Sequence, residues 1–391
     1  MQIFLDIVFL AVGFTLLAKG SDFFVDGASS VARRFKIPQL VIGLTIVAMG
    51  TSMPEAAVSI QAALQGSADI SIGNVVGSNI LNILIILGLS AVVFPLAVQK
   101  STQIIEIPIV IGASALLLVL GLLGVIEWWC GIILLLGFIG YLTYLFFSAK
   151  KSQKENATNE DDGAEFNEAP IWFTLLLSGI GALVAISGQF YEACDNIYCL
   201  VSGVALFVGF LAYSVYLIIK SKNAVKVTEA CAGATVEFKE IPIWKSVVFI
   251  VFGMAMIIFG SEFAVSSATS LAQRMGVGDA FIGLTIVALG TSLPELFTSV
   301  AAAMKKNSDI AIGNIVGSNI FNILFILGIT SLITPIAFDS KYLIDTLISL
   351  GCAIALLILT LKGKKLHRWG GAIMLAGYVC YFIYLYMREI A

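Results

Sequence analysis

The chain has 391 residues, of which 59% are hydrophobic and 12% are charged. Soluble globular proteins carry about 25% charged residues, so this composition excludes a soluble domain. Many apolar runs approach the roughly 20 residues of a membrane-spanning helix, whereas the strands of a membrane β-barrel would alternate apolar and polar residues. The sequence therefore predicts a polytopic helical protein in a lipid bilayer, and its net charge of −3 gives no indication of nucleic-acid binding.

Two long segments occur twice, 240 residues apart. The first reads IGLTIVAMGTSMPE at 42–55 and returns as IGLTIVALGTSLPE at 282–295. The second reads DISIGNVVGSNILNIL at 69–84 and returns as DIAIGNIVGSNIFNIL at 309–324. From 42 to 88, 31 of 47 positions match their partners. A fixed internal offset is the mark of a duplicated structural unit, so we expect two copies of one unit.

Apolar runs predict five helices in each copy. In the first copy they cover 3–32, 37–65, 69–97, 104–123 and 127–148, and in the second 246–272, 277–304, 309–337, 342–361 and 367–388. Two further apolar runs, at 170–188 and 199–219, lie between the copies. We therefore expect an all-α polytopic membrane protein with ten core transmembrane helices and two extra transmembrane helices inserted between the halves. Its predicted units are an N-terminal five-helix half at 1–148, linkers with the two additional helices at 149–243, and a C-terminal five-helix half at 244–391.

The distribution of Lys and Arg predicts the orientation in a plasma (inner) membrane. An extracytoplasmic N-terminus puts 18 of the 22 basic residues on the cytoplasmic side, with loops 149–169 and 220–245 also cytoplasmic. Five helices per copy and an even-numbered insert then make the two copies antiparallel. Such inverted repeats are typical of secondary transporters, which bind substrate near the bilayer midplane between the repeats.

Two glutamates stand apart from the other acidic residues. Glu55 and Glu295 lie near the middle of the second predicted helix of each copy, inside apolar sequence. A carboxylate at membrane depth is costly and indicates a functional site. The alternative is a salt bridge between helices, for which only Lys19 in the first helix lies at comparable depth. We therefore favour a functional role for both glutamates.

The residues before each glutamate predict an interrupted helix. Pro54 and Pro294 each remove a backbone donor and clash with the carbonyl four residues earlier. Irregular backbone at membrane depth persists only where it is buried in protein or lines a cavity. The loosened segments offer backbone carbonyls and side-chain hydroxyls beside each carboxylate; these belong to Ala48, Thr51, Ser52, Ala288, Thr291 and Ser292.

The second repeated motif adds hydroxyl and amide side chains. Four-residue spacing puts serine and asparagine on one helix face, and the residues are Ser78, Asn79, Asn82, Ser318, Asn319 and Asn322. These could bind a cation or simply bond neighbouring helices, and we favour cation binding. Because neither motif contains Cys or His, the ligands are all oxygen, which argues against zinc, copper or iron. Ca2+ takes 6–8 oxygens in flexible geometry, two carboxylates neutralise it, and Na+ competing for the same oxygens would make an antiporter.

Both GTSxPE segments and both GNxVGSN segments resemble the repeats of the calcium/cation antiporter superfamily, in its sodium/calcium exchanger branch of prokaryotic type. The resemblance implies exchange of Ca2+ for Na+ as transported ions, without a cofactor. With the amides from the ligand count, the expected Ca2+ ligands are Glu55, Glu295, Thr51, Thr291, Asn82 and Asn322. The expected Na+ ligands are Ala48, Ser52, Ser78, Ala288, Ser292 and Ser318.

One departure from the family pattern concerns Asn322, where many members, including the K+-dependent branch, carry Asp. The main alternative function is an H+-coupled antiporter for Ca2+ or another divalent cation, which needs only Glu55 and Glu295 to titrate. A cation channel is a further alternative. A membrane enzyme is disfavoured because the sequence shows neither a nucleophile–base pair nor a cofactor motif. The sequence leaves the stoichiometry and the oligomeric state open.

Overall fold

The computed structural model describes residues 2–35, 37–64, 69–157, 242–274 and 288–390. The first half contains α1 (Gln2–Arg34), α2 (Gln39–Ile42), η1 (Gly43–Val47), α3 (Ala48–Thr51), α4 (Met53–Leu64), α5 (Asp69–Leu81), η2 (Asn82–Leu87), α6 (Gly88–Val93), β1 (Leu96–Ala97), η3 (Thr102–Glu106), α7 (Ile107–Gly121), β2 (Val125–Ile126) and α8 (Trp128–Ala157). The second half contains α11 (Ile243–Arg274), α13 (Ala288–Thr291), α14 (Leu293–Met304), α15 (Ser308–Ile320), η6 (Phe321–Ile326), α16 (Leu327–Ile333), β3 (Ile336–Ala337), α17 (Ser340–Leu361), η7 (Lys362–Lys364), β4 (Lys365–Leu366) and α18 (Arg368–Ile390). The two predicted inserted helices, at 170–188 and 199–219, lie outside the described residues.

The described residues include eight helices that are long and apolar enough to cross a membrane, and the bent pair at 39–64 would be a ninth. The protein is therefore a helical integral membrane protein, as its composition predicts. Its outer helices expose large apolar side chains, among them Leu136, Ile139 and Phe147 on α8. Because such side chains are costly in water but not in lipid, this outer surface suits the hydrocarbon of a bilayer.

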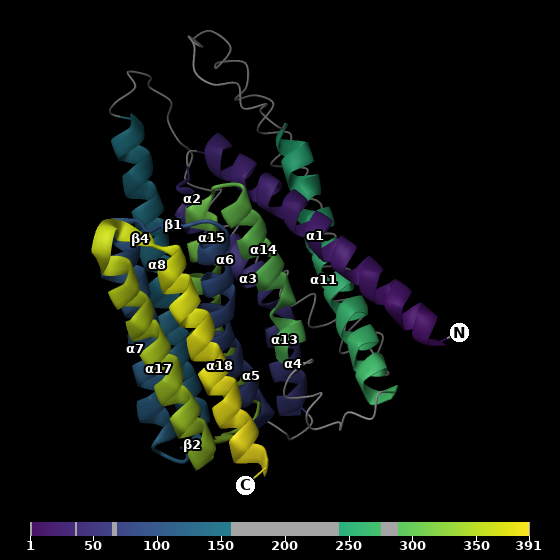
Figure 1. Ribbon diagram of the computed structural model, residues 1–391. Coiled ribbons are helices and arrows are strands. Elements are labelled where there is room, and N and C mark those ends of the chain that lie inside the picture. Colours follow the sequence, from purple (N-terminus) through teal and green to yellow (C-terminus); the bar gives the residue numbers. More distant parts are fainter. Residues whose placement is uncertain (1, 36, 65–68, 158–241, 275–287, 391) are drawn as a thin grey trace, which may run out of the picture.

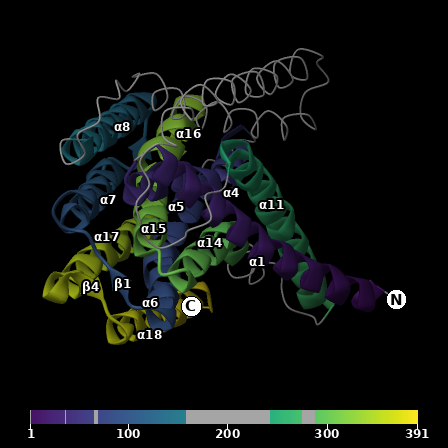
Figure 2. The same cartoon turned by 90° about the horizontal axis from the view of Figure 1, so that it is seen from above.

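The helices that carry the second repeated motif form the centre of the molecule. The most apolar stretch of the span at 308–333 is 94% buried and that of the span at 70–93 is 78% buried, against 17% for α1 and 28% for α11. Figure 2 shows α5 and α15 in the middle, with α7, α8, α17 and α18 on one side and α1 and α11 on the other. The repeated polar residues are thus held in the part of the protein farthest from lipid.

The long helices α1 and α11 cross each other at the edge of the molecule (Figure 1). Gly13 on α1 approaches Gly260 on α11, and Gly20 approaches Gly253, so closely that a Cβ on any of the four would collide with backbone atoms. Small residues permit this approach between membrane helices. Since residue numbers rise along α1 as they fall along α11, the two helices are antiparallel.

The third helix of each half ends earlier than the sequence analysis expects. The predicted ends at 97 and 337 are wrong, because α6 ends at Val93 and α16 at Ile333. The next residues, Phe94 and Thr334, are extended, and a proline follows each. A residue before proline is driven out of the helical region, which explains both ends.

Four short strands join the two halves, and two of them, β1 and β3, follow these helix ends. Antiparallel pairing connects β1 to β4, with Leu96 opposite Leu366, and β2 to β3, with Ile126 opposite Ile336. Each strand therefore pairs with one from the other half of the chain. These two-residue strands are the only departure from an all-α fold within the described residues. The last helix of the first half, α8, also continues to Ala157, past the predicted end at 148.

Candidate cation-binding site

The predicted helix interruptions occur at Ser52 and Ser292. Ser52 has φ −84° and ψ 12°, and Ser292 has φ −90° and ψ 5°, so both depart from helical geometry. The axis bends by 44° between 39–51 and 53–64. Pro54 and Pro294 then stand in the first turn of α4 and α14, where a missing N–H costs nothing. The prolines thus end one helix and begin the next, as the sequence analysis expects.

The two carboxylates that follow these breaks are buried and lie in one polar cluster. Glu55 is 1% exposed and Glu295 is 0% exposed. Ser52 Oγ donates to Glu295 Oε1 at 2.7 Å, and Ser292 Oγ donates to Glu55 Oε1 at 3.0 Å. Each serine therefore bonds the glutamate of the other half. The second oxygen of each carboxylate, Oε2, has no hydrogen-bond partner.

The salt-bridge interpretation of the glutamates finds no support in the described part of the chain. None of the ion pairs there involves Glu55 or Glu295. Lys19, the one candidate at similar depth, is exposed on α1. Among the residues that the structure describes, no basic side chain therefore pairs with either buried carboxylate.

Four asparagines form a second symmetric group, which follows Ser78 and Ser318 along the chain. Asn79 and Asn319 each donate to the other's backbone carbonyl, at 3.3 and 3.2 Å. Asn82 Nδ2 donates to Asn319 Oδ1 at 3.0 Å, and Asn322 Nδ2 donates to Asn79 Oδ1 at 3.1 Å. This arrangement uses both amide nitrogens and leaves Oδ1 of Asn82 and of Asn322 buried without a donor. Asn79 and Asn319 therefore fix the orientation of the two amides.

Several of the predicted hydroxyl and carbonyl ligands adjoin this cluster. Ser78 Oγ lies 3.3 Å from Ser292 Oγ, and Ser318 Oγ lies 3.3 Å from the Ala48 carbonyl oxygen. Thr51 Oγ1 is also 3.3 Å from that carbonyl oxygen. The Thr51 and Ser318 hydroxyls interact with the Glu295 carboxylate, and the Thr291 hydroxyl with the Glu55 carboxylate.

The structure thus brings nine of the twelve predicted ligands together around the two carboxylates. Asn82 and Asn322 belong instead to the asparagine group, and Ala288 is the first residue of α13.

The sequence analysis assigned no role to a second layer of polar residues. Asn74 Nδ2 donates to the Glu55 backbone carbonyl at 3.2 Å and to Ser59 Oγ at 3.0 Å. In the other half Asn314 Nδ2 donates to the Glu295 backbone carbonyl at 3.4 Å and to Ser299 Oγ at 2.9 Å. These bonds anchor the first turn after each break to the neighbouring helix. The available signal was that both asparagines occupy the same place in the repeated motif.

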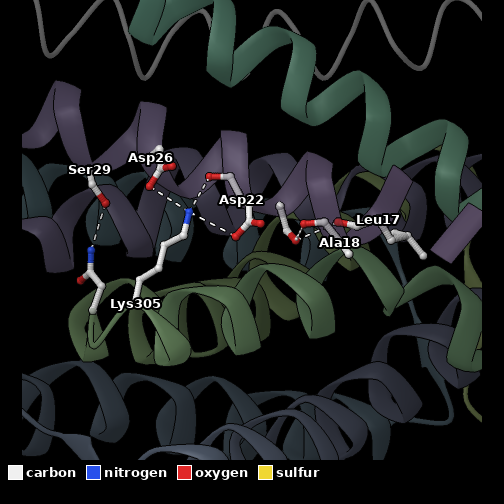
Figure 3. A network of polar contacts seen from close by, with 8 residues as sticks. Leu17, Ala18, Asp22, Asp26, Ser29 and Lys305 are labelled. Carbon is white, nitrogen blue, oxygen red and sulfur yellow. Dashed lines mark hydrogen bonds and ion pairs between the residues drawn. The ribbon is translucent and has the colours of Figure 1, made fainter. Parts of the chain in front are cut away.

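A polar network also ties α1 to the turn between α14 and α15 (Figure 3). Lys305 Nζ lies 3.2 Å from Asp22 Oδ1 and 2.8 Å from Asp26 Oδ1, and it donates to the Asp22 carbonyl oxygen at 2.8 Å. Asn307 Nδ2 donates to Ser29 Oγ at 3.0 Å. Asp22 and Asp26 of α1 thus bind a lysine from the other half.

Together these features define a helical membrane protein with a buried cluster of oxygen-bearing side chains to which both halves of the chain contribute. A family model described as "Sodium/calcium exchanger protein" matches residues 5–147 and 245–387. One relative, the protein CaxA of Alkalimonas amylolytica, is 33% identical over 379 residues, which are 96% of each chain. The sodium/calcium exchanger MaX1 of Methanosarcina acetivorans is 30% identical over 98% of this chain and 99% of its own.

A solved structure of the sodium–calcium exchanger NCX_Mj superposes with a TM-score of 0.68 at 28% identity, over 97% of this chain and 99% of that one. The chain therefore belongs to the sodium/calcium exchanger family. This confirms the resemblance that the repeated motifs carry, and it places the protein among transporters of cations.

Proposed function

We propose that the protein exchanges Ca2+ for Na+ across the membrane, by alternating access at a midplane site that the two halves share. The observation that carries this proposal is a set of four buried acceptor oxygens without donors: Oε2 of Glu55 and Glu295, and Oδ1 of Asn82 and Asn322. Buried acceptors without partners are costly, and a cation supplies the positive charge that they lack. Two carboxylates match the charge of one Ca2+ ion.

The Ca2+ ligands in this proposal are the carboxylates, amides and hydroxyls of Glu55, Glu295, Asn82, Asn322, Thr51 and Thr291. They reach the 6–8 oxygens of a typical Ca2+ site. The Na+ ligands are hydroxyl and carbonyl oxygens of Ala48, Ser52, Ser78, Ala288, Ser292 and Ser318. Such oxygens suit a cation of lower charge, which requires fewer anionic ligands.

Competition between Na+ and Ca2+ for the two carboxylates couples the transport of one ion to that of the other. Ser52 and Ser292 each donate a hydrogen bond to a glutamate of the other half, and a hydroxyl that donates still offers lone pairs to a cation. Na+ can therefore bind at the serines while the same carboxylates compensate its charge. Ca2+ needs both carboxylates for itself, so the two cations exclude each other at the site, as antiport requires.

We further propose that the two halves, 1–148 and 244–391, are inverted repeats separated by a linker unit at 149–243. The antiparallel crossing of α1 and α11 and the matched contacts of the glutamates and asparagines support this arrangement. The excess of basic residues on one side supports an extracytoplasmic N-terminus in the plasma (inner) membrane. The cytoplasmic loops in this topology are 149–169 and 220–245.

The test is uptake of 45Ca2+ into proteoliposomes that contain the purified protein. We expect an outward Na+ gradient to drive uptake, and Glu55→Gln and Glu295→Gln each to abolish it, because an amide leaves half of the Ca2+ charge uncompensated. Glu127→Gln, a partly exposed glutamate far from the cluster in sequence, is the matched control and should transport normally. Uptake that follows a pH gradient and ignores Na+ would establish the H+-coupled alternative. Full activity of either variant of the buried pair would overturn the proposed site.

A further inference from the structure

A third buried glutamate lies outside the proposed transport site. Glu106 is the last residue of η3, at the beginning of the span 102–121, and it is 2% exposed. Its Oε1 accepts a hydrogen bond from the Tyr144 hydroxyl of α8 at 2.8 Å, while its Oε2 has no partner. None of the ion pairs in the described part of the chain involves Glu106. A buried carboxylate without a counter-charge is costly, so this arrangement calls for a cation.

The second half of the chain shows how a carboxylate one position away from the equivalent place is neutralised, because the offset of 240 residues pairs Glu106 with Thr346 and Asp345 precedes Thr346. There Asp345 on α17 accepts two hydrogen bonds from Arg388 Nη1, at 3.1 and 2.9 Å. The Arg388 guanidinium also lies over the Tyr384 ring, 5.5 Å from its centroid. With the offset of 240 residues, Tyr384 corresponds to Tyr144 and Arg388 corresponds to Ser148. The carboxylate of the first half therefore keeps its tyrosine but lacks the arginine.

Other oxygens around Glu106 also lack partners. Tyr141 lies one turn before Tyr144 on α8 and interacts electrostatically with Glu106, and its hydroxyl is buried without a hydrogen bond. Thr102 lies one turn before Glu106 in η3, and its Oγ1 is likewise buried without a hydrogen-bond partner. Two facing helices thus gather one carboxylate, two phenol oxygens and one hydroxyl. All four are oxygen ligands of the kind that hard cations bind.

We propose that Glu106, Thr102, Tyr141 and Tyr144 form a binding site for one monovalent cation, with Na+ as the ion that fits, separate from the transport site. A single carboxylate neutralises a single positive charge, which favours a monovalent over a divalent ion. The bound ion connects η3 to α8 as the Arg388 guanidinium connects α18 to α17. Under the proposed topology the site lies toward the cytoplasmic ends of these helices, beside Lys100, so it samples cytosolic Na+.

The experiment separates this site from the transport site by removing the transport carboxylates. We would measure the unfolding temperature of the purified full chain carrying Glu55→Gln and Glu295→Gln, while NaCl replaces choline chloride at constant ionic strength. We expect Na+ to raise the unfolding temperature of this background protein in a saturable way. Adding Glu106→Gln should abolish the Na+-dependent rise in unfolding temperature. In choline chloride the same substitution should raise the unfolding temperature, because it removes an uncompensated buried charge. Added Glu127→Gln is the control and should leave the rise intact.

A second variant tests the comparison between the halves directly. Ser148→Arg in the same background introduces a guanidinium at the place that Arg388 occupies in the second half. We expect it to stabilise the protein in choline and to abolish the response to Na+, as a tethered cation would. A Na+ response that survives Glu106→Gln, or a background protein that shows none, would overturn the proposal. Neither outcome depends on the proposed exchange of Ca2+ for Na+, because the flux assay tests that exchange and the unfolding temperature tests the Glu106 site.

Discussion

The network around Lys305 predicts that one exposed lysine holds α1 against the second half of the protein. In Lys305→Gln the side chain loses its charge and becomes one atom shorter, so both ion pairs to Asp22 and Asp26 disappear. The side chains involved are 30%, 48% and 47% exposed, and solvent therefore screens them. Exposed pairs contribute about 0.2–1 kcal/mol each, so the two together come to about 1 kcal/mol.

Hydrogen exchange of the α1 amides measures this quantity, because exchange follows the free energy of local opening. A loss of about 1 kcal/mol makes the open state roughly fivefold more populated, since about 1.4 kcal/mol corresponds to a factor of ten. We expect amides at 21–32 to exchange roughly fivefold faster in Lys305→Gln. Lys306→Gln is the matched control, since the neighbouring lysine is exposed and makes no ion pair with the described residues.

Salt provides an independent check on the same reasoning. At about 1 M ionic strength the screening length falls to about 3 Å, so the wild-type protein should lose most of the contribution of the two pairs. Exchange at 21–32 should then become nearly the same in the wild type and in Lys305→Gln. Equal exchange in Lys305→Gln and Lys306→Gln at low salt would refute the assigned role of Lys305.

Two further predictions concern the packing of the long helices and the charge of the site. A Cβ on Gly260 would collide with the carbonyl oxygen of Gly13 and with Leu16, so Gly260→Ala should cost about 1–3 kcal/mol of stability. Thermal unfolding should show this loss, whereas Gly140→Ala, where a Cβ meets nothing within 4 Å, should not. Because Asn322 keeps the site at two negative charges, Ca2+ uptake should be equal with K+ or choline on the Ca2+ side, and Asn322→Asp should introduce a K+ requirement. A strict K+ requirement in the wild type would contradict this charge argument.

The sequence was sufficient to predict the features that a single helix determines. Pro54 and Pro294 interrupt their helices through local backbone chemistry, and Glu55 and Glu295 are recognisable because a carboxylate within an apolar run has few explanations. The same is true of the serine and asparagine face, whose spacing follows from one helical turn. These predictions needed no knowledge of which helices are neighbours.

Contacts between the halves could not be predicted in this way. Nothing in the sequence indicates that Ser52 donates to the glutamate of the other half rather than to its own. The same holds for the pairing of Asn82 with Asn319 and for the strands that join Leu96 to Leu366. The early helix ends were in principle predictable, because Pro95 and Pro335 are visible in the sequence and restrict the residue before them.

The crossed hydrogen bonds imply that neither half can build the proposed cation site alone. Each carboxylate keeps one oxygen free because a serine of the opposite half occupies the other, and each ligand amide is oriented by an asparagine of the opposite half. A displacement of one half relative to the other would therefore disturb all four free oxygens together. Such a displacement would cost most when a cation is bound, because the cation adds its own bonds to both halves. In the proposed mechanism, cation binding would therefore be coupled to the relative position of the halves by the residues that we propose as ligands.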